Sequence, residues 1–165
     1  MVTVPVPRTG GPVVVELGPG TGAFTSAIQR RLGGRGRHIA VEINERFAAQ
    51  LAKSHPGVEV VRADAAHLAG VLAERGLVHA DVVVSGLPWA AFTEARQRDV
   101  LTAVAGALSP HGAFTTFAYV HARWAGSARR LARSLESQFD EVVVGRTVWA
   151  NLPPALVYHC RRPTR

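Results

Sequence analysis

The chain has 165 residues, a single cysteine and a formal net charge of +7. A chain of this length folds as one domain, no apolar run approaches the ~20 residues of a membrane span, and the N-terminus has no signal-peptide pattern. One cysteine excludes an internal disulfide and gives no case for structural zinc. The positive charge favours an anionic partner, which is nucleic acid or a membrane surface. Alternatively, it reflects the arginine-rich composition that a GC-rich genome produces.

Short valine-rich runs alternate with amphipathic stretches along the whole chain, which predicts a parallel α/β sheet. We expect strands at residues 12–17, 37–42, 58–62, 79–85, 112–119, 140–148 and 155–161. We expect helices at residues 21–32, 44–54, 65–75, 93–108 and 125–138. The segment between the last two strands is too short for a crossover helix, so these two strands should form an antiparallel hairpin.

The first strand runs into a glycine turn that opens a helix. The turn contains Gly18, Pro19, Gly20 and Gly22, and Glu16 stands at the end of the strand. Glycines let a ligand lie against the backbone, and the free N–H groups of the helix point at it. A dinucleotide site and a structural turn without ligand remain open, whereas a P-loop is excluded because no Gly-Lys-Ser/Thr follows. A carboxylate at Glu16 suits an ammonium-bearing ligand and repels a pyrophosphate.

Two further acids stand where the next strands end, at the edge of the sheet that binds ligands. Glu42 follows Gly20 by 22 residues, about the spacing at which a carboxylate binds the ribose hydroxyls. Asp64 is placed to accept from an adenine amino group, with Ile43 and Ala65 against the faces of the ring. The alternatives are a solvated neighbour of a helix N-cap for Glu42 and a plain N-cap for Asp64.

The fourth strand ends in a Ser-Gly-Leu-Pro-Trp segment, residues 85–89, that resembles motif IV of amine methyltransferases. In relatives that methylate adenine or glutamine nitrogens, an Asn or Asp before x-Pro-aromatic accepts a hydrogen bond from the amine. Gly86 occupies that acceptor position here. The backbone carbonyls of this segment, the Ser85 hydroxyl, Leu87 and the face of Trp89 are left to hold the nitrogen. A flexible alkylamine needs less directional contact than a planar base amine.

The glycine turn resembles motif I of class I S-adenosylmethionine-dependent methyltransferases. The order of motifs is similar to that of ribosomal RNA adenine dimethyltransferases, and more closely to that of bacterial phospholipid N-methyltransferases. The second likeness rests on the segments VELGPGTG, VVSGLP, a fifth strand with Phe and Tyr, and NLPPALVY at residues 151–158. It implies a Rossmann-like, seven-stranded, mostly parallel sheet with a C-terminal antiparallel hairpin and helices on both faces, and S-adenosylmethionine as cofactor.

The same likeness implies methyl transfer to the amine of phosphatidylethanolamine-type lipids. Without a signal-peptide pattern or a membrane span, we expect a cytoplasmic protein that works at the inner membrane surface. We expect a single methyltransferase domain over residues 1–165 that does not have most of the family's N-terminal segment. That segment is implicated in membrane contact and in closing the cofactor site. A ribosomal RNA adenine methyltransferase, with nucleic acid as partner, and a cofactor-binding protein without transferase activity are the alternatives.

The acceptor amine has to lose its proton, so a proton acceptor or a water path is required. Tyr119 and His121 at the end of the fifth strand are the candidates, with a packing role as the alternative. Four arginines of the following segment are expected to bind a lipid phosphate or to form the solvated side of a helix: Arg123, Arg129, Arg130 and Arg133. Trp149 and Asn151, near the hairpin, are expected to shape the substrate entrance.

The predicted site therefore has two parts and no metal. The predicted catalytic residues are Ser85, Leu87, Trp89 and Tyr119. The predicted cofactor-binding residues are Glu16, Gly18, Pro19, Gly20, Gly22, Glu42, Ile43, Asp64, Ala65 and Ser85.

Overall fold

The structure is a computed structural model that describes residues 2–119, 126–147 and 154–164, apart from the side chain of Ser127. Its strands are β1 (Val13–Leu17), β2 (Arg37–Glu42), β3 (Glu59–Arg62), β4 (Ala80–Ser85), β5 (Leu108–Tyr119), β6 (Phe139–Val144) and β7 (Ala155–Pro163). Its helices are α1 (Thr25–Leu32), α2 (Glu45–Ser54), α3 (Leu68–Ala73), α4 (Glu94–Ala107) and α5 (Gly126–Gln138), with short 3-10 turns η1 (Ala65–His67) and η2 (Trp89–Ala91).

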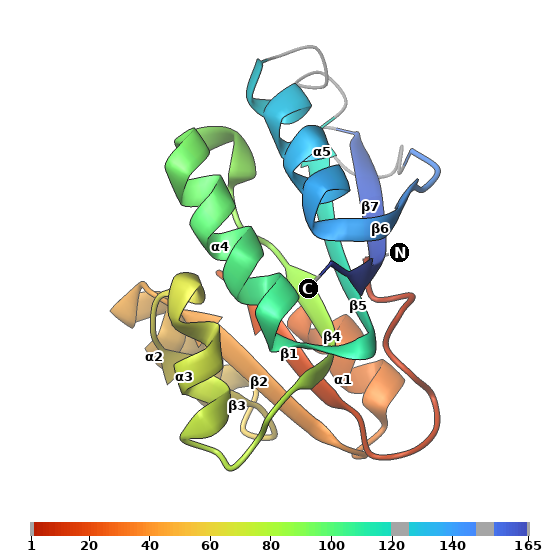
Figure 1. The fold of residues 1–165 in the computed structure, drawn as a ribbon. Helices are drawn as coiled ribbons and strands as arrows, with labels where there is room; N and C mark the ends of the chain where they lie inside the picture. Colours follow the sequence, from red (N-terminus) through yellow and green to blue (C-terminus); the bar gives the residue numbers. More distant parts are fainter. Residues whose placement is uncertain (1, 120–125, 148–153, 165) are drawn as a thin grey trace.

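The seven described strands form one sheet in the order β3-β2-β1-β4-β5-β7-β6 (Figure 1). The first five strands are parallel, and β7 lies antiparallel between β5 and β6. The predicted fold class and the terminal antiparallel hairpin are confirmed. Chain order reverses beside β1, whose neighbours are β2 and β4, and ligands bind outside the carboxyl ends of strands at such a switch point.

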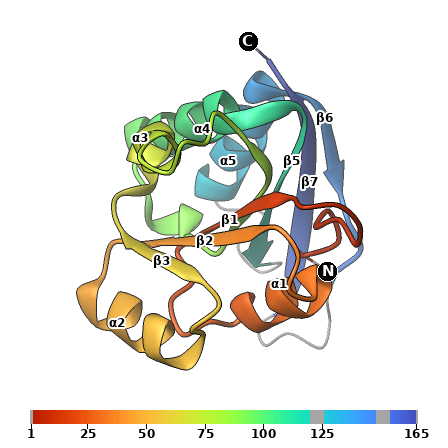
Figure 2. The same cartoon turned by 90° about the horizontal axis from the view of Figure 1, so that it is seen from below.

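Helices cover both faces of the sheet, with α1 and α2 on one side and α3, α4 and α5 on the other (Figure 2). The larger core lies under the second group and includes the buried Leu101, Phe114 and Leu131. A smaller core packs Ile28 of α1 against Val14 and other strand valines. Because both faces are covered, the central strands are continuous apolar runs rather than alternating ones.

Several boundaries differ from the predicted ones for physical reasons. The first helix begins at Thr25 rather than at residue 21, because the glycine turn takes positive φ angles that a helix excludes. The helix expected at residues 65–75 is a 3-10 turn capped by Asp64, followed by the short α3. Strand β5 begins at Leu108, four residues early, where its pairing with β4 is irregular. Within the described residues, no helix has the length and apolarity needed to cross a bilayer.

Candidate active site

The glycine turn leaves one open backbone surface at the carboxyl end of β1. Gly18, Gly20 and Gly22 have φ angles of +63°, +54° and +87°. A Cβ atom on Gly20 would meet nothing within 4 Å, whereas one on Gly22 would lie 3.1 Å from Leu51 Cδ1. Gly22 therefore allows the turn to pack against Leu51 of α2, and Gly20 presents bare backbone to free space. Pro19, which is buried, accepts a hydrogen bond from the Gly22 N–H at 2.9 Å.

Glu42 lies directly opposite this turn. Its Oε2 accepts a hydrogen bond from the Gly20 N–H at 3.1 Å, and its Oε1 accepts one from the Asn44 N–H at 2.9 Å. A carboxylate has about four acceptor positions, so further hydroxyl donors can be accommodated. The next side chain, Ile43, is 63% exposed. An acid and an exposed apolar side chain thus stand together beside the open backbone of Gly20.

Glu16 is fully buried beneath the turn. Its Oε2 accepts from the Thr25 hydroxyl at 2.8 Å and from His38 Nε2 at 3.1 Å. His38 Nδ1 lies 2.8 Å from the side-chain amide nitrogen of Gln29, so the ring bridges Gln29 and Glu16. The second oxygen of Glu16, Oε1, is buried and has no partner within the described residues. An unpaired carboxylate oxygen two residues before Gly18 fits an ammonium-bearing ligand.

Asp64 lies at the end of β3 and caps η1, as one of its two predicted roles requires. Its Oδ1 accepts from the Ala66 N–H at 2.8 Å and from Arg96 Nη2 at 2.6 Å. The hydrogen bond from Arg96 is the main cause that lowers the pKa of Asp64. Oδ2 accepts no hydrogen bond from the described part of the chain and is left for a ligand. The adjacent Ala65 is 6% exposed.

An apolar pocket of about 250 Å³ opens along the same edge of the sheet, at the carboxyl ends of β4 and β5. Its lining includes the 86–91 segment, the last residues of β5, and two residues of α5. The large side chains that line it are Leu87, Trp89, Phe117, Tyr119 and Leu131. The aromatic ring of Tyr119 lies 5.4 Å from that of Phe117, centroid to centroid. No carboxylate is among the described residues that line the pocket.

Ser85 and Trp89 form an internal hydrogen-bonded pair. The Trp89 indole N–H donates to the Ser85 hydroxyl at 3.2 Å and to the Thr116 hydroxyl at 2.8 Å. Ser85 is fully buried, and Trp89 is 3% exposed with its ring edge-on to Phe114. The structure thus gives Ser85 a positioning role, and Trp89 offers the pocket a small part of its ring. The direct contacts with an amine that the sequence predicts for both side chains stay predictions.

Gly86 brings the two motifs into contact. Its N–H donates to the carbonyl of Leu17 at 2.8 Å, and a Cβ atom on it would lie 2.7 Å from the carbonyl oxygen of Gly18. A side chain at position 86 therefore requires the backbone to shift. The Gly86 carbonyl accepts no hydrogen bond within the described residues, whereas the carbonyls of Leu87 and Trp89 do. This loop therefore offers a backbone oxygen, and no side chain at position 86, as an acceptor.

The remaining predicted residues divide between described and undescribed parts of the chain. His121, Arg123, Trp149 and Asn151 lie outside the described residues. On α5, Arg129 and Arg133 are exposed and Arg130 is half-buried, so Arg130 fits the solvated face, one of the two predicted alternatives, less well.

Residues 14–112 match the methyltransferase-domain family, which covers more than half of the chain. The chain is 37% identical over 162 residues to an ornithine lipid N-methyltransferase from Singulisphaera acidiphila, covering 94% of this chain and 79% of that protein. It belongs to the S-adenosylmethionine-dependent methyltransferases.

Two other comparisons agree with this assignment. The methyltransferase is 38% identical over 116 residues to ribosomal RNA small subunit methyltransferase A from a Polaromonas species, covering 63% of this chain and a third (33%) of that protein. Fibrillarin from Aeropyrum pernix, solved with natively bound S-adenosyl-L-methionine, shares the fold with a TM-score of 0.70 at 19% identity, covering 94% of this chain and 68% of that one.

Two residues of this methyltransferase that shape the site were not predicted from its sequence. Thr116 of β5 fixes the indole of Trp89, and Arg96 of α4 holds Asp64. Neither lies in a motif, because each acts on a residue far away in the chain. A buried threonine in an apolar strand was the only signal for Thr116, and Arg96 gave none.

Proposed function

We propose that this methyltransferase transfers methyl groups to the amine of a membrane lipid, of the phosphatidylethanolamine type. The observation that carries the proposal is the apolar pocket with a glycine at the acceptor position. A planar base amine needs a side-chain acceptor with fixed direction, and Gly86 has no room for one. An alkylamine needs only one acceptor and an apolar surface. The 37% identical relative that acts on an ornithine lipid supports the same class of acceptor.

The cofactor half of the proposed site is the glycine turn and the strand ends beside it. The open backbone at Gly20, Glu42 opposite it and the unpaired oxygen of Glu16 fit S-adenosylmethionine, whose ribose and ammonium need such acceptors. We assign the adenine contacts to Asp64 and the faces of the ring to neighbouring apolar residues. The full set is Glu16, Gly18, Pro19, Gly20, Gly22, Glu42, Ile43, Asp64 and Ala65, with Ser85 beneath it.

In the acceptor half, the Gly86 carbonyl accepts from the amine while Leu87, Trp89 and Tyr119 form the apolar walls. The bound cofactor supplies an activated methyl group on a sulfonium. Displacement on such a group needs no metal, so alignment of the amine nitrogen supplies most of the catalysis. An apolar pocket disfavours an ammonium ion, which lowers the pKa of the entering amine. The proton that the amine loses passes to water at the mouth of the pocket, where Tyr119 is 38% exposed.

The test is transfer of labelled methyl groups from S-adenosylmethionine to vesicles that contain phosphatidylethanolamine, with ornithine lipid vesicles and ribosomal RNA as parallel substrates. We expect label in lipid and none in RNA. Glu42→Gln should lower transfer by roughly 10- to 100-fold, because hydrogen bonds to a charged acceptor contribute about 1.5–3 kcal/mol. Glu45→Gln, which changes an exposed acid on α2, is the matched control and should keep full activity.

Label in ornithine lipid alone would correct the lipid type and keep the lipid class. Label only in RNA would overturn the proposal in favour of the second candidate, an adenine methyltransferase. That candidate is supported by the 38% identity over 116 residues to a ribosomal RNA methyltransferase and by the net charge of +7. We further propose that the protein works at the inner membrane surface, where its lipid substrate would be found.

A further inference from the structure

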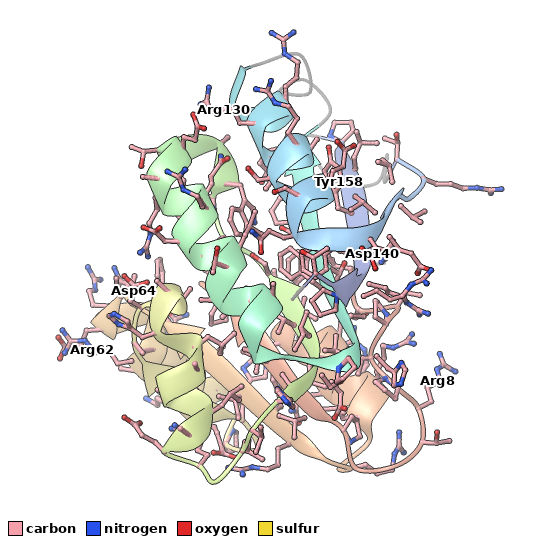
Figure 3. All side chains as sticks on the ribbon, viewed as in Figure 1. Arg8, Arg62, Asp64, Arg130, Asp140 and Tyr158 are labelled. Carbon is pink, nitrogen blue, oxygen red and sulfur yellow. The ribbon has the colours of Figure 1, made fainter. Side chains whose placement is uncertain are left out.

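A groove between α4 and α5 collects three arginines outside the proposed active site. Its volume is about 280 Å³, and its lining includes Arg98 and the buried Leu101 of α4, with Arg130, Arg133 and Ser134 of α5. These residues recur every three or four positions along each helix, so they form one face of α4 and one face of α5. Figure 3 shows Arg130 extending from α5 on the side of α4.

The three guanidinium groups of this arginine groove are unpaired. None of them makes a hydrogen bond or an ion pair with another residue in the described part of the chain. The Nε atom of Arg130 is buried and has no partner there. Glu94, the acid at the rim, is exposed and forms no ion pair with these arginines. A buried guanidinium N–H that has lost its water and gained no acceptor is a donor prepared for an anion.

We propose that the arginine groove binds the phosphate of an anionic phospholipid and thereby holds the protein at a negatively charged membrane surface. Arginine forks match phosphate oxygens in a bidentate way, and Ser134 adds a hydroxyl donor to the same wall. Three positive groups and one acid leave an excess of positive charge that suits one phosphodiester.

The position of the groove favours a lipid over a nucleic acid. Ala128 and Leu131 of α5 line the apolar pocket, while Arg130 and Arg133 of the same helix line the groove. A phosphate in the groove therefore brings the bilayer surface next to the pocket proposed for the lipid amine. Nucleic acids are bound through a track of several phosphates, whereas this groove accommodates one. The inference adds an anchoring site to the proposed function and does not require methyl transfer.

The test is co-sedimentation of the protein with vesicles of phosphatidylcholine and phosphatidylglycerol, which contain no amine that can be methylated. Replacing Arg98, Arg130 and Arg133 together by Gln should weaken binding about a hundredfold, since each cationic side chain near an anionic leaflet contributes roughly a fivefold factor. The matched control replaces the exposed helix arginines Arg30, Arg46 and Arg129 by Gln and removes the same charge. It should weaken binding less than about threefold. Glu94→Gln should strengthen binding.

Binding of S-adenosylhomocysteine by each variant verifies that it is folded. Equal losses in the groove variant and in the control would overturn the proposal, because net charge would then explain the binding. Loss of affinity for inorganic phosphate with unchanged vesicle binding would also overturn it, in favour of a free phosphate ligand. A groove variant that loses binding to RNA and keeps binding to vesicles would overturn it in favour of a nucleic acid. Failure of methyl transfer alone would leave this result intact and concern only the proposed function.

Discussion

Arg96 fixes the orientation of Asp64, and this single pair connects α4 to the proposed adenine site. Arg96 Nη2 and the Ala66 N–H both donate to Oδ1 of Asp64, at 2.6 and 2.8 Å. Two donors on one oxygen hold the carboxylate still and leave Oδ2 for a ligand. Arg96 is therefore a positioning residue that acts through Asp64.

Replacing Arg96 by Gln should lower the affinity for S-adenosylhomocysteine roughly threefold to tenfold, since a partly exposed ion pair contributes less than a buried one. The affinity for S-inosylhomocysteine, which has no 6-amino group to donate, should change very little in the same variant. Arg98→Gln, two positions along the same helix, is the control and should leave both affinities unchanged. Calorimetry measures the affinity of each variant and of the unmodified protein for both ligands. Equal losses for the two ligands would contradict a role through the adenine contact.

The same pair determines a pH dependence. The hydrogen bond from Arg96 lowers the pKa of Asp64 below its ordinary value. Because the folded-state pKa is depressed, the ionised pair stabilises the fold above the unfolded pKa of about 4, and that contribution is lost as pH falls through the folded value. In Arg96→Gln the pKa of Asp64 should rise. An NMR titration of the Asp64 carboxyl carbon that shows the same midpoint in both proteins would contradict this.

Two adjacent buried threonines of β5 should respond oppositely to loss of the hydroxyl. The Thr116 hydroxyl accepts from the Trp89 indole, whereas Oγ1 of Thr115 is buried without a partner in the described residues. Thr116→Val leaves the indole N–H with a weaker set of acceptors and should destabilise the protein by about 1–2 kcal/mol. Thr115→Val should be neutral or stabilising. Urea unfolding of the two variants tests this, and equal effects would count against the hydrogen-bond assignment.

At the level of single residues, the sequence predicts the groups that follow strand ends and misses the groups that support them. Glu42 and Asp64 stand directly after strands, so their places at one edge of the sheet follow from the parallel topology. Thr116 and Arg96 act on residues 27 and 32 positions away. Only the placement of β5 and α4 brings these partners together, and no local pattern contains that information.

The glycine turn is the element that joins strand, helix and the proposed cofactor site, and its two later glycines serve different purposes. Gly20 has φ +54° with open space before it, and Gly22 has φ +87° with Leu51 and His55 at 3.1 and 3.3 Å from a Cβ position. Of these two glycines, only Gly22 is enclosed by packing.

Gly20→Ala should cost about 1 kcal/mol of stability, because a left-handed residue is mildly strained, yet it should reduce cofactor affinity strongly. Gly22→Ala should cost roughly 2–3 kcal/mol, since strain and overpacking add. Thermal unfolding with and without S-adenosylhomocysteine separates the two effects. A Gly20→Ala protein that is stabilised by this ligand as much as the unmodified one would contradict the proposed position of the cofactor.

Elements are more predictable than their ends. Every predicted strand and helix has a counterpart among the described elements, because Val-rich runs and amphipathic stretches differ in period. The start of α1 could not be predicted well, since Ala23 and Phe24 are compatible with a helix and only the backbone geometry of the turn excludes them. The early start of β5 depends on its irregular pairing with β4, which is a tertiary contact.

For the whole molecule, the order of the strands in the sheet could not be predicted completely from the sequence. The short connection indicates an antiparallel hairpin of β6 and β7, but not which of the two lies beside β5. The structure places β7 there, with Phe114 paired to Cys160 and Tyr119 paired to Ala155. This register buries the Cys160 thiol and raises its pKa to about 12. It also aligns the ends of β5 and β7 beside the apolar pocket.

The proposed function requires an alkylamine beside the Gly86 carbonyl while the cofactor lies on the glycine turn. A crystal structure with S-adenosylhomocysteine and a short-chain phosphatidylethanolamine shows both positions at once. We expect ribose hydroxyls on Glu42 and the amine nitrogen within hydrogen-bonding distance of the Gly86 carbonyl. An amine bound away from the apolar pocket, or a cofactor away from Gly20, would contradict it.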